Sequence, residues 1–194
     1  MNTYLSSSII FYNNKITTKL QETYGNIEIP VMMDWEDSLM SASAAYVTEG
    51  GGDILEIGFG MGISAGYMHS HSINSHTIVE NHPDIIPKAV EWANNKSNVT
   101  IISQSWYNVK DSLGTFDGVF YDTFEDENYK DFSSSLSTWT KSGTKVTFWN
   151  DDNAESNNHQ IQTSYQQINI TPPNSASVYF RNGNTTYYMP MKEF

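Results

Sequence analysis

Three glycines alternate with apolar residues in the segment Glu56-Ile57-Gly58-Phe59-Gly60-Met61-Gly62. Glycine lets a backbone approach a ligand closely, and a helix that starts directly after such a turn offers unpaired N–H groups. The nicotinamide-dinucleotide fingerprint needs a glycine at the sixth place counted from Gly58, but Ile63 stands there. The pattern acid-x-Gly-x-Gly-x-Gly therefore predicts a different adenosine-type cofactor site, rather than a plain structural turn.

Two further positions suit the same kind of ligand. Glu80 ends a short apolar run about twenty positions after Gly60, the spacing at which an acidic residue meets ribose hydroxyls. Its carboxylate can accept hydrogen bonds from two vicinal hydroxyl groups. Ser105 and Trp106 follow the next apolar run, where an indole would either lie against an adenine ring or pack in the core. The sequence leaves both roles of Trp106 open.

These residues need a framework of short strands that alternate with helices. Apolar runs predict strands at residues 53–57, 77–80, 99–102, 116–121 and 145–149. Apolar positions three and four residues apart predict helices at 35–47, 63–68, 83–95 and 129–139. Such alternation implies right-handed crossovers and a mainly parallel sheet.

The two ends of the chain follow other patterns. Strands are predicted at 164–171, 177–181 and 185–189, with Asn182-Gly183-Asn184 as a hairpin turn, so an antiparallel edge should complete the sheet. Residues 1–30 are polar and irregular, and we expect an N-terminal arm or lid there. Residues 31–194 are expected to form a single domain.

Composition excludes several classes of partner and site. The formal charge of -12, from 22 acidic and 10 basic residues, repels phosphate backbones and anionic lipid headgroups, so we expect neither nucleic acid nor membrane as a partner. The absence of cysteine excludes disulfides, thiolate metal sites and cysteine nucleophiles. The five histidines form no helix-spaced metal pair with acids, and we predict no metal site. The N-terminus lacks the pattern of a signal peptide, which favours a cytoplasmic location.

Several segments together resemble one branch of a known enzyme class. The run Leu55–Met61, the pair Glu80-Asn81, the pair Ser105-Trp106 and the run Phe116–Thr123 are similar to guanidinoacetate N-methyltransferases and the related fungal protein-arginine N5-methyltransferases. Upstream, residues 30–36 resemble the Pro-Val-Met-x-x-Trp-Glu segment of that branch. The resemblance covers about residues 30–149. It implies a Rossmann-like class I methyltransferase fold, α/β, with a mostly parallel seven-stranded sheet and an antiparallel C-terminal hairpin edge.

The resemblance also implies site residues. S-adenosyl-L-methionine would be the cofactor, and Glu36 and Asp122 would be the catalytic pair that binds the guanidino group of the acceptor. Trp35 and Phe124 would border the substrate. The residues implied to bind the cofactor are Glu56, Gly58, Phe59, Gly60, Met61, Gly62, Glu80, Asn81, Ser105, Trp106 and Asp122.

Elementary chemistry supports the pairing of two acids with such a substrate. A guanidinium group is cationic at neutral pH, and its planar fork matches paired carboxylates, one of which could accept the proton lost on methylation. The alternatives are that Glu36 only favours the helix dipole and that Asp122 only caps the next helix. Phe124 departs from the tyrosine common at this place in the family, and the chain after Trp149 is much shorter than in the family.

We therefore predict an S-adenosylmethionine-dependent N-methyltransferase acting on a small guanidino compound, working as a monomer or homodimer. One alternative is another acceptor: protein arginine, a small amine or a hydroxyl. Another is an S-adenosyl-binding module that has lost turnover.

Overall fold

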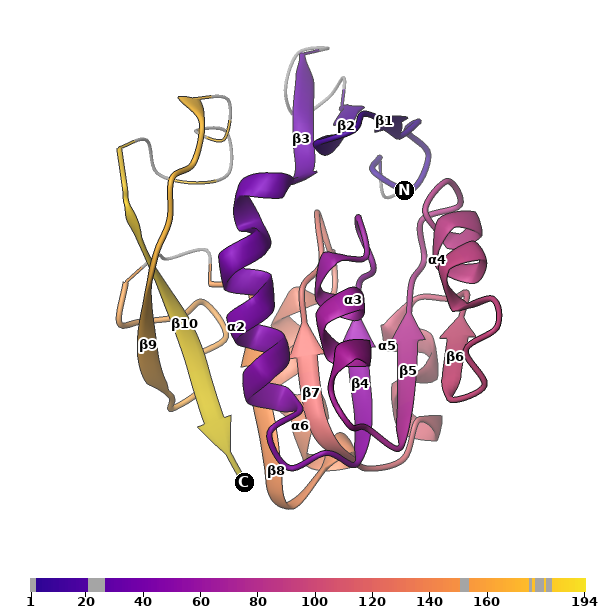
Figure 1. Cartoon of the computed structure of the whole chain (residues 1–194), viewed down its shortest axis with the longest axis vertical. Coiled ribbons are helices and arrows are strands. Elements are labelled where there is room, and N and C mark those ends of the chain that lie inside the picture. The colour runs from indigo at the N-terminus through magenta and orange to yellow at the C-terminus, as the bar shows by residue number, and fades with distance from the viewer. Residues whose placement is uncertain (1–2, 21–26, 151–153, 175, 177–179, 181–182) are drawn as a thin grey trace.

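The central sheet has the strand order β6-β5-β4-β7-β8-β10-β9 in the computed structural model, which describes residues 3–20, 27–150, 154–174, 176, 180 and 183–194. Its parallel strands are β4 (Asp53–Ile57), β5 (Ser75–Val79), β6 (Val99–Ile102), β7 (Phe116–Tyr121) and β8 (Thr140–Phe148). At one side, β10 (Thr186–Glu193) runs antiparallel to both β8 and β9 (Ser164–Asn169). The α/β fold with a mostly parallel seven-stranded sheet and an antiparallel edge is thus confirmed for the described residues (Figure 1).

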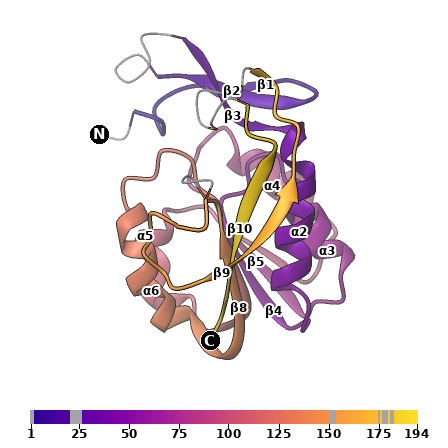
Figure 2. The same cartoon turned by 90° about the vertical axis from the view of Figure 1, so that its left-hand side faces the viewer.

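Helices cover both faces of this sheet (Figure 2). One face carries α2 (Asp37–Val47), α3 (Ile63–Ser70) and α4 (Ile86–Ala93), and the other carries α5 (Trp106–Val109) and α6 (Phe132–Trp139). Short 3-10 turns precede or follow helices at η1 (Asp34–Glu36), η2 (Lys110–Ser112) and η3 (Tyr129–Asp131). The predicted helices therefore form, although α4 begins at Ile86 instead of residue 83, because His82 caps a turn there by accepting the N–H groups of Ile85 and Ile86.

Alternation along the strands divides the core between the two faces. On β7, Phe120 belongs to the cluster under α2 and α3, whereas Val119 and Tyr121 belong to the cluster under α5 and α6. The contact of α2 with β7 is close: a Cβ on Gly118 would lie 2.1 Å from the carbonyl oxygen of Val47. The helix layer that contains α2 is therefore tightly packed against β7.

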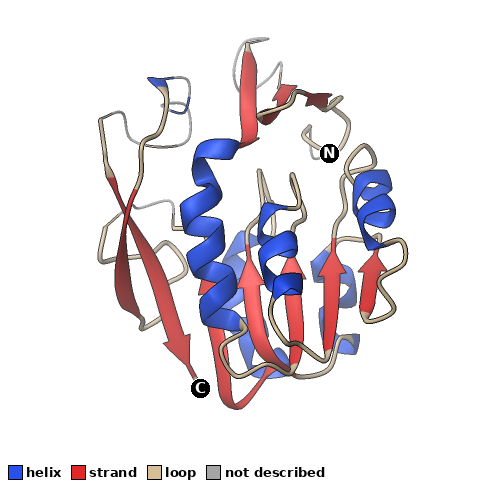
Figure 3. Cartoon of the chain, in the orientation of Figure 1, coloured by secondary structure: helices blue, strands red, loops and turns tan. Residues whose placement is uncertain are grey.

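A second, small sheet lies across the carboxyl ends of the parallel strands (Figure 3). It consists of β1 (Ile10–Phe11), β2 (Lys15–Lys19) and β3 (Glu28–Met33), paired antiparallel. The sequence did not predict these strands. The reason is visible in β2, where Thr17 and Thr18 are buried but hydrogen-bond to Glu28 and to Ser7, so their burial leaves no apolar pattern.

The C-terminal segment differs in detail from the prediction. Thr186–Met191 pairs with Ser164–Asn169, so the antiparallel hairpin is made by β9 and β10. The strand predicted at 177–181 and the turn at 182–184 lie largely outside the described residues. Among the residues that are described, none of the helices combines the length and apolar character needed to cross a bilayer. A cytoplasmic location stays a prediction.

Candidate active site

A cavity of about 770 Å³ lies at the carboxyl edge of the parallel strands, and Val31 and Met32 of the N-terminal sheet line it as well. Its walls come from the glycine loop after β4, from the loops after β5, β6, β7 and β8, and from the N-terminal segment. Ligands of open α/β sheets bind at this edge. The predicted site residues that line the cavity are Glu36, Gly58, Phe59, Gly60, Glu80, Asn81, Trp106, Asp122 and Phe124.

Gly58 is required by the closeness of two strands. Its φ is +92°, and a Cβ there would lie 1.9 Å from the carbonyl oxygen of Asp122. Two hydrogen bonds hold the chain at this place. Gly58 N–H donates to Val79 O, and Asp122 N–H donates to Ile57 O, each at 2.9 Å. The glycine loop is therefore tied to both neighbouring strands, and Asp122 is held beside it.

Met32 of β3 covers the outer side of this loop. Its sulfur accepts the N–H of Met61 at 3.2 Å and would lie 2.7 Å from a Cβ on Gly60. The N-terminal sheet thus touches the loop directly and contributes to the cavity wall.

Glu80 connects the loops that follow β4 and β5. Its Oε2 accepts the N–H of Phe59 at 2.9 Å, and its Oε1 accepts those of Asn81 and His82 at 2.8 and 2.7 Å. The side chain is 6% exposed and lines the cavity. A carboxylate has about four lone-pair sites, so three bonds from described residues leave room for about one hydroxyl group of a ligand.

Trp106 both packs in the core and lines the cavity. Its ring meets Tyr121 and Trp139 edge to face, at 5.8 and 5.7 Å. Its indole N–H donates to Asp126 Oδ2 at 2.6 Å, and the hydroxyl of Tyr121 donates to the same oxygen. The two roles that the sequence left open for this tryptophan are thus compatible.

Glu36 and Asp122 line the same cavity although they come from distant parts of the chain. Glu36 stands in η1 directly before α2, is 3% exposed, and accepts the N–H of Met33 at 2.8 Å through Oε1. Asp122 directly follows β7. The fold therefore brings the start of α2 over the carboxyl edge, as pairing of these two acids requires.

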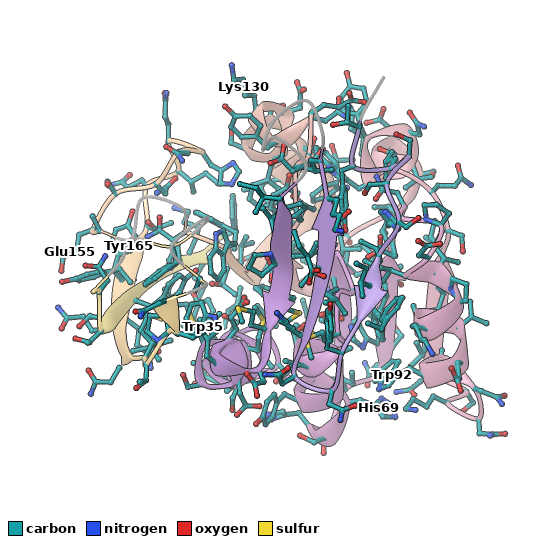
Figure 4. All side chains as sticks on the ribbon, turned by 90° about the horizontal axis from the view of Figure 1, so that it is seen from above. Trp35, His69, Trp92, Lys130, Glu155 and Tyr165 are labelled. Atoms are coloured by element: carbon teal, nitrogen blue, oxygen red, sulfur yellow. The ribbon has the colours of Figure 1, made fainter. Side chains whose placement is uncertain are left out.

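The two predicted substrate neighbours lie in different surroundings. Phe124 lines the cavity, where its ring meets Tyr4 edge to face at 5.0 Å. Trp35 is not among the lining residues; its ring packs on Phe180 at 5.3 Å, on the side of α2 nearest β9 and β10 (Figure 4). Trp35 therefore supports the cavity from outside.

Four predicted cofactor residues are also not among the lining residues: Glu56, Met61, Gly62 and Ser105. Glu56 is fully buried between Ser64 and His76. Gly62 caps α3 with φ +72°, where a Cβ would meet the Phe59 ring at 2.6 Å. Met61 belongs to the loop itself, and Ser105 directly precedes α5.

Several lining residues were not predicted, among them Tyr4, Met32, Asp126, Trp149 and His159. Trp149 and Asp126 directly or closely follow strands at the carboxyl edge, which is a usable signal. Tyr4 and His159 come from segments without a periodic pattern, and nothing in the sequence indicates them.

The cavity is acidic. Its lining includes Glu36, Glu80, Asp122, Glu125, Asp126 and Glu127, and no lysine or arginine from the described part of the chain. Burial, and then the charges of Glu80 and Asp84, raise the pKa of the Tyr4 phenol, so this hydroxyl stays neutral. The surroundings favour a cationic ligand.

A parallel sheet in this order, with a glycine loop after its central strand and an acid after the next, defines a Rossmann-like methyltransferase. The family model "Guanidinoacetate N-methyltransferase" matches residues 12–145, and the chain belongs to this family. The predicted class, an S-adenosylmethionine-dependent methyltransferase, and its cofactor are thereby confirmed.

Similar proteins include the protein arginine N-methyltransferases 2 of two fungi. The one from Kluyveromyces lactis is 35% identical over 140 residues, which are 66% of this chain and 32% of that protein. The one from Aspergillus fumigatus is 36% identical over 141 residues, 69% of this chain and 31% of that protein. The matched part thus spans about a third of the length of these relatives.

Solved structures show the same fold at low sequence identity. The N-methyltransferase NodS of Bradyrhizobium japonicum, in complex with S-adenosyl-L-homocysteine, has a TM-score of 0.59 at 12% identity, covering 81% of this chain and 86% of that one. Spermidine synthase from Thermotoga maritima has a TM-score of 0.62 at 10% identity, covering 96% and 72%.

Proposed function

We propose that this chain transfers a methyl group from S-adenosylmethionine to a nitrogen of a guanidino group. The observation that carries the proposal is that Glu36 and Asp122 line one cavity together with the glycine loop. A guanidinium ion needs paired carboxylates, and the acidic lining supplies them.

The protein's part in such a reaction is mainly positional. The sulfonium of the cofactor is already activated, so the site has to align the acceptor nitrogen with the methyl carbon and remove a proton as the bond forms. Asp122 suits the proton acceptor because it lines the cavity directly after β7, where its backbone lies against Gly58 of the cofactor loop. Glu36, at the start of α2, suits the other side of the guanidinium.

On the cofactor side, Glu80 would accept a ribose hydroxyl and Trp106 would border the adenine. Phe59 and Asn81 line the same region. This assignment places the nucleoside toward β5 and β6 and leaves the space beside β4 and β7 for the methionine part and the acceptor.

For the acceptor we propose a small guanidino compound, in line with the family. Arginine in a protein is the second candidate, because the curated relatives are named protein arginine N-methyltransferase 2. The two differ in what must fit through the mouth of the cavity.

An acceptor screen tests both proposals. Release of S-adenosylhomocysteine is followed with guanidinoacetate, agmatine, free arginine and arginine-bearing peptides, using the wild type and the variants Asp122→Asn and Glu36→Gln. Glu91→Gln serves as a matched control, because this acid is exposed on α4 away from the cavity.

We expect turnover with a guanidino acceptor. Asp122→Asn should lower kcat by roughly 10²-fold or more through loss of the proton acceptor. Glu36→Gln should raise the KM for the acceptor as well, while Glu91→Gln should behave as wild type. Turnover confined to amines or hydroxyls, or full activity of Asp122→Asn, would contradict the guanidino assignment; turnover confined to peptides would select the protein acceptor.

A further inference from the structure

A chain of three buried polar side chains runs from the interior to the cavity wall. His76 of β5 and Glu56 of β4 are both 0% exposed, and Ser64 in the first turn of α3 is 3% exposed. His76 Nε2 lies 2.9 Å from Glu56 Oε2, and the hydroxyl of Ser64 donates to Glu56 Oε1. His76 Nε2 and Glu56 Oε2 are thus in close polar contact, although the direction of the N–H bond does not meet hydrogen-bond geometry. Of the three residues, Ser64 lines the cavity.

The neighbourhood holds this arrangement in place. His76 meets the ring of Trp92 edge to face at 6.2 Å. Trp92 also packs on His69 at 5.8 Å, and Figure 4 shows these two side chains near each other. A buried carboxylate that is far from water is costly unless its oxygens face donors. Here one oxygen faces His76 and the other faces Ser64.

This arrangement fixes what Ser64 can offer to a ligand. A carboxylate can only accept, so the hydrogen of the Ser64 hydroxyl points at Glu56. The hydroxyl oxygen is left with lone pairs and is polarised by the charge behind it. Toward the cavity it is therefore a hydrogen-bond acceptor that attracts a cationic donor and repels an anion.

The cofactor has one group of that kind. Its sulfonium carries no N–H, its methionine carboxylate is an anion, and its ribose and adenine are assigned above to the side of Glu80 and Trp106. We propose that Ser64, polarised by the buried Glu56–His76 pair, accepts a hydrogen bond from the α-ammonium group of S-adenosylmethionine. The proposal rests on the cofactor site and is independent of which acceptor is methylated.

Binding measurements test it without turnover. Affinities are measured by calorimetry for S-adenosylhomocysteine, for its analogue with hydrogen in place of the α-amino group, and for 5′-methylthioadenosine, which lacks the amino-acid part. The proteins are the wild type, Ser64→Ala and the matched control Ser70→Ala, whose exposed hydroxyl lies at the far end of α3 and donates to Tyr67 O.

We expect Ser64→Ala to weaken S-adenosylhomocysteine about tenfold, the size expected for a hydrogen bond to a charged group. The same variant should bind the deaminated analogue and 5′-methylthioadenosine as the wild type does, and Ser70→Ala should bind all three normally. Glu56→Gln provides a second test. Its amide can donate to Ser64 and turn the hydroxyl hydrogen toward the cavity, which should weaken S-adenosylhomocysteine selectively.

Equal affinity of Ser64→Ala and wild type for S-adenosylhomocysteine would overturn the proposal. So would an equal loss for all three ligands, since that result would mean a distorted pocket. A failed acceptor screen would leave these binding differences readable, so the two proposals fail separately.

Discussion

Replacing Gly58 by alanine tests the close backbone contact between Gly58 and Asp122, which holds Asp122 at the cofactor loop. The new Cβ would lie 1.9 Å from the carbonyl oxygen of Asp122 and 3.0 Å from its carbonyl carbon. Because the obstacle is backbone, it cannot rotate away as a side-chain end could. Either the loop or the end of β7 must move.

The cost can be estimated from two separate effects. A non-glycine residue at φ +92° costs about 1–3 kcal/mol, and forcing atoms into a packed site costs about 1–3 kcal/mol more. The sum of at least about 2 kcal/mol lowers the Tm of a protein of this size by about 4–8 °C or more. Because Asp122 shifts with its carbonyl, affinity for S-adenosylhomocysteine and kcat should fall as well.

Gly66→Ala is the matched control. Gly66 lies inside α3, has no positive φ, and a Cβ there would meet nothing within 4 Å. Alanine should stabilise this helix by about 0.5–1 kcal/mol. Thermal unfolding monitored by circular dichroism, with and without S-adenosylhomocysteine, gives both values. If Gly58→Ala kept the wild-type Tm and ligand affinity, the close backbone contact between Gly58 and Asp122 would not have the importance inferred for it.

Two other predictions concern carboxylates outside the catalytic pair. Asp126→Asn leaves one of the donors Trp106, Tyr121 and the Asn128 N–H without an acceptor, so thermal unfolding should show a loss of about 1–3 kcal/mol; an unchanged Tm would contradict it. Lys141, 2.8 Å away, holds the pKa of Asp117 below its ordinary value, so this carboxyl stabilises the fold above the ordinary aspartate pKa and loses that effect as the pH falls through the lowered value. Since both side chains are partly exposed, Asp117→Asn should lower the free energy of unfolding by at most about 1 kcal/mol at pH 7. The Tm of the variant should also fall less steeply in acid than that of the wild type. An equally steep fall of the Tm in acid would speak against the pairing of Asp117 with Lys141.

The parallel part of the fold could be predicted from the sequence because its strands are short apolar runs, and β4 and β7 are buried on both faces. β4, β6 and β7 have the predicted bounds, since an apolar run flanked by turn residues fits such a strand closely. The N-terminal sheet was not readable. Its strand β2 buries two threonines that hydrogen-bond to neighbouring polar groups, and a pattern of hydrophobicity cannot detect such a strand.

Apart from the family resemblance, the sequence predicted site residues only where their place directly after a strand indicates them. The glycine loop, Glu80 and Asp122 are marked by their places at strand ends, and all face or border the cavity. Glu56 was also assigned to the cofactor, but it does not line the cavity; it is fully buried and accepts the hydroxyl of Ser64, which does. Tyr4 reaches the cavity through long-range packing, for which the sequence carries no signal.

The three N–H groups that converge on Glu80 have a consequence for how fast and how favourably the cofactor binds. They join the backbones of Phe59, Asn81 and His82 through one carboxylate of the protein itself. Loops that are already joined lose little conformational entropy when a ligand arrives, so more of the contact energy appears as affinity. Association should then proceed without a slow loop-ordering phase in stopped-flow traces.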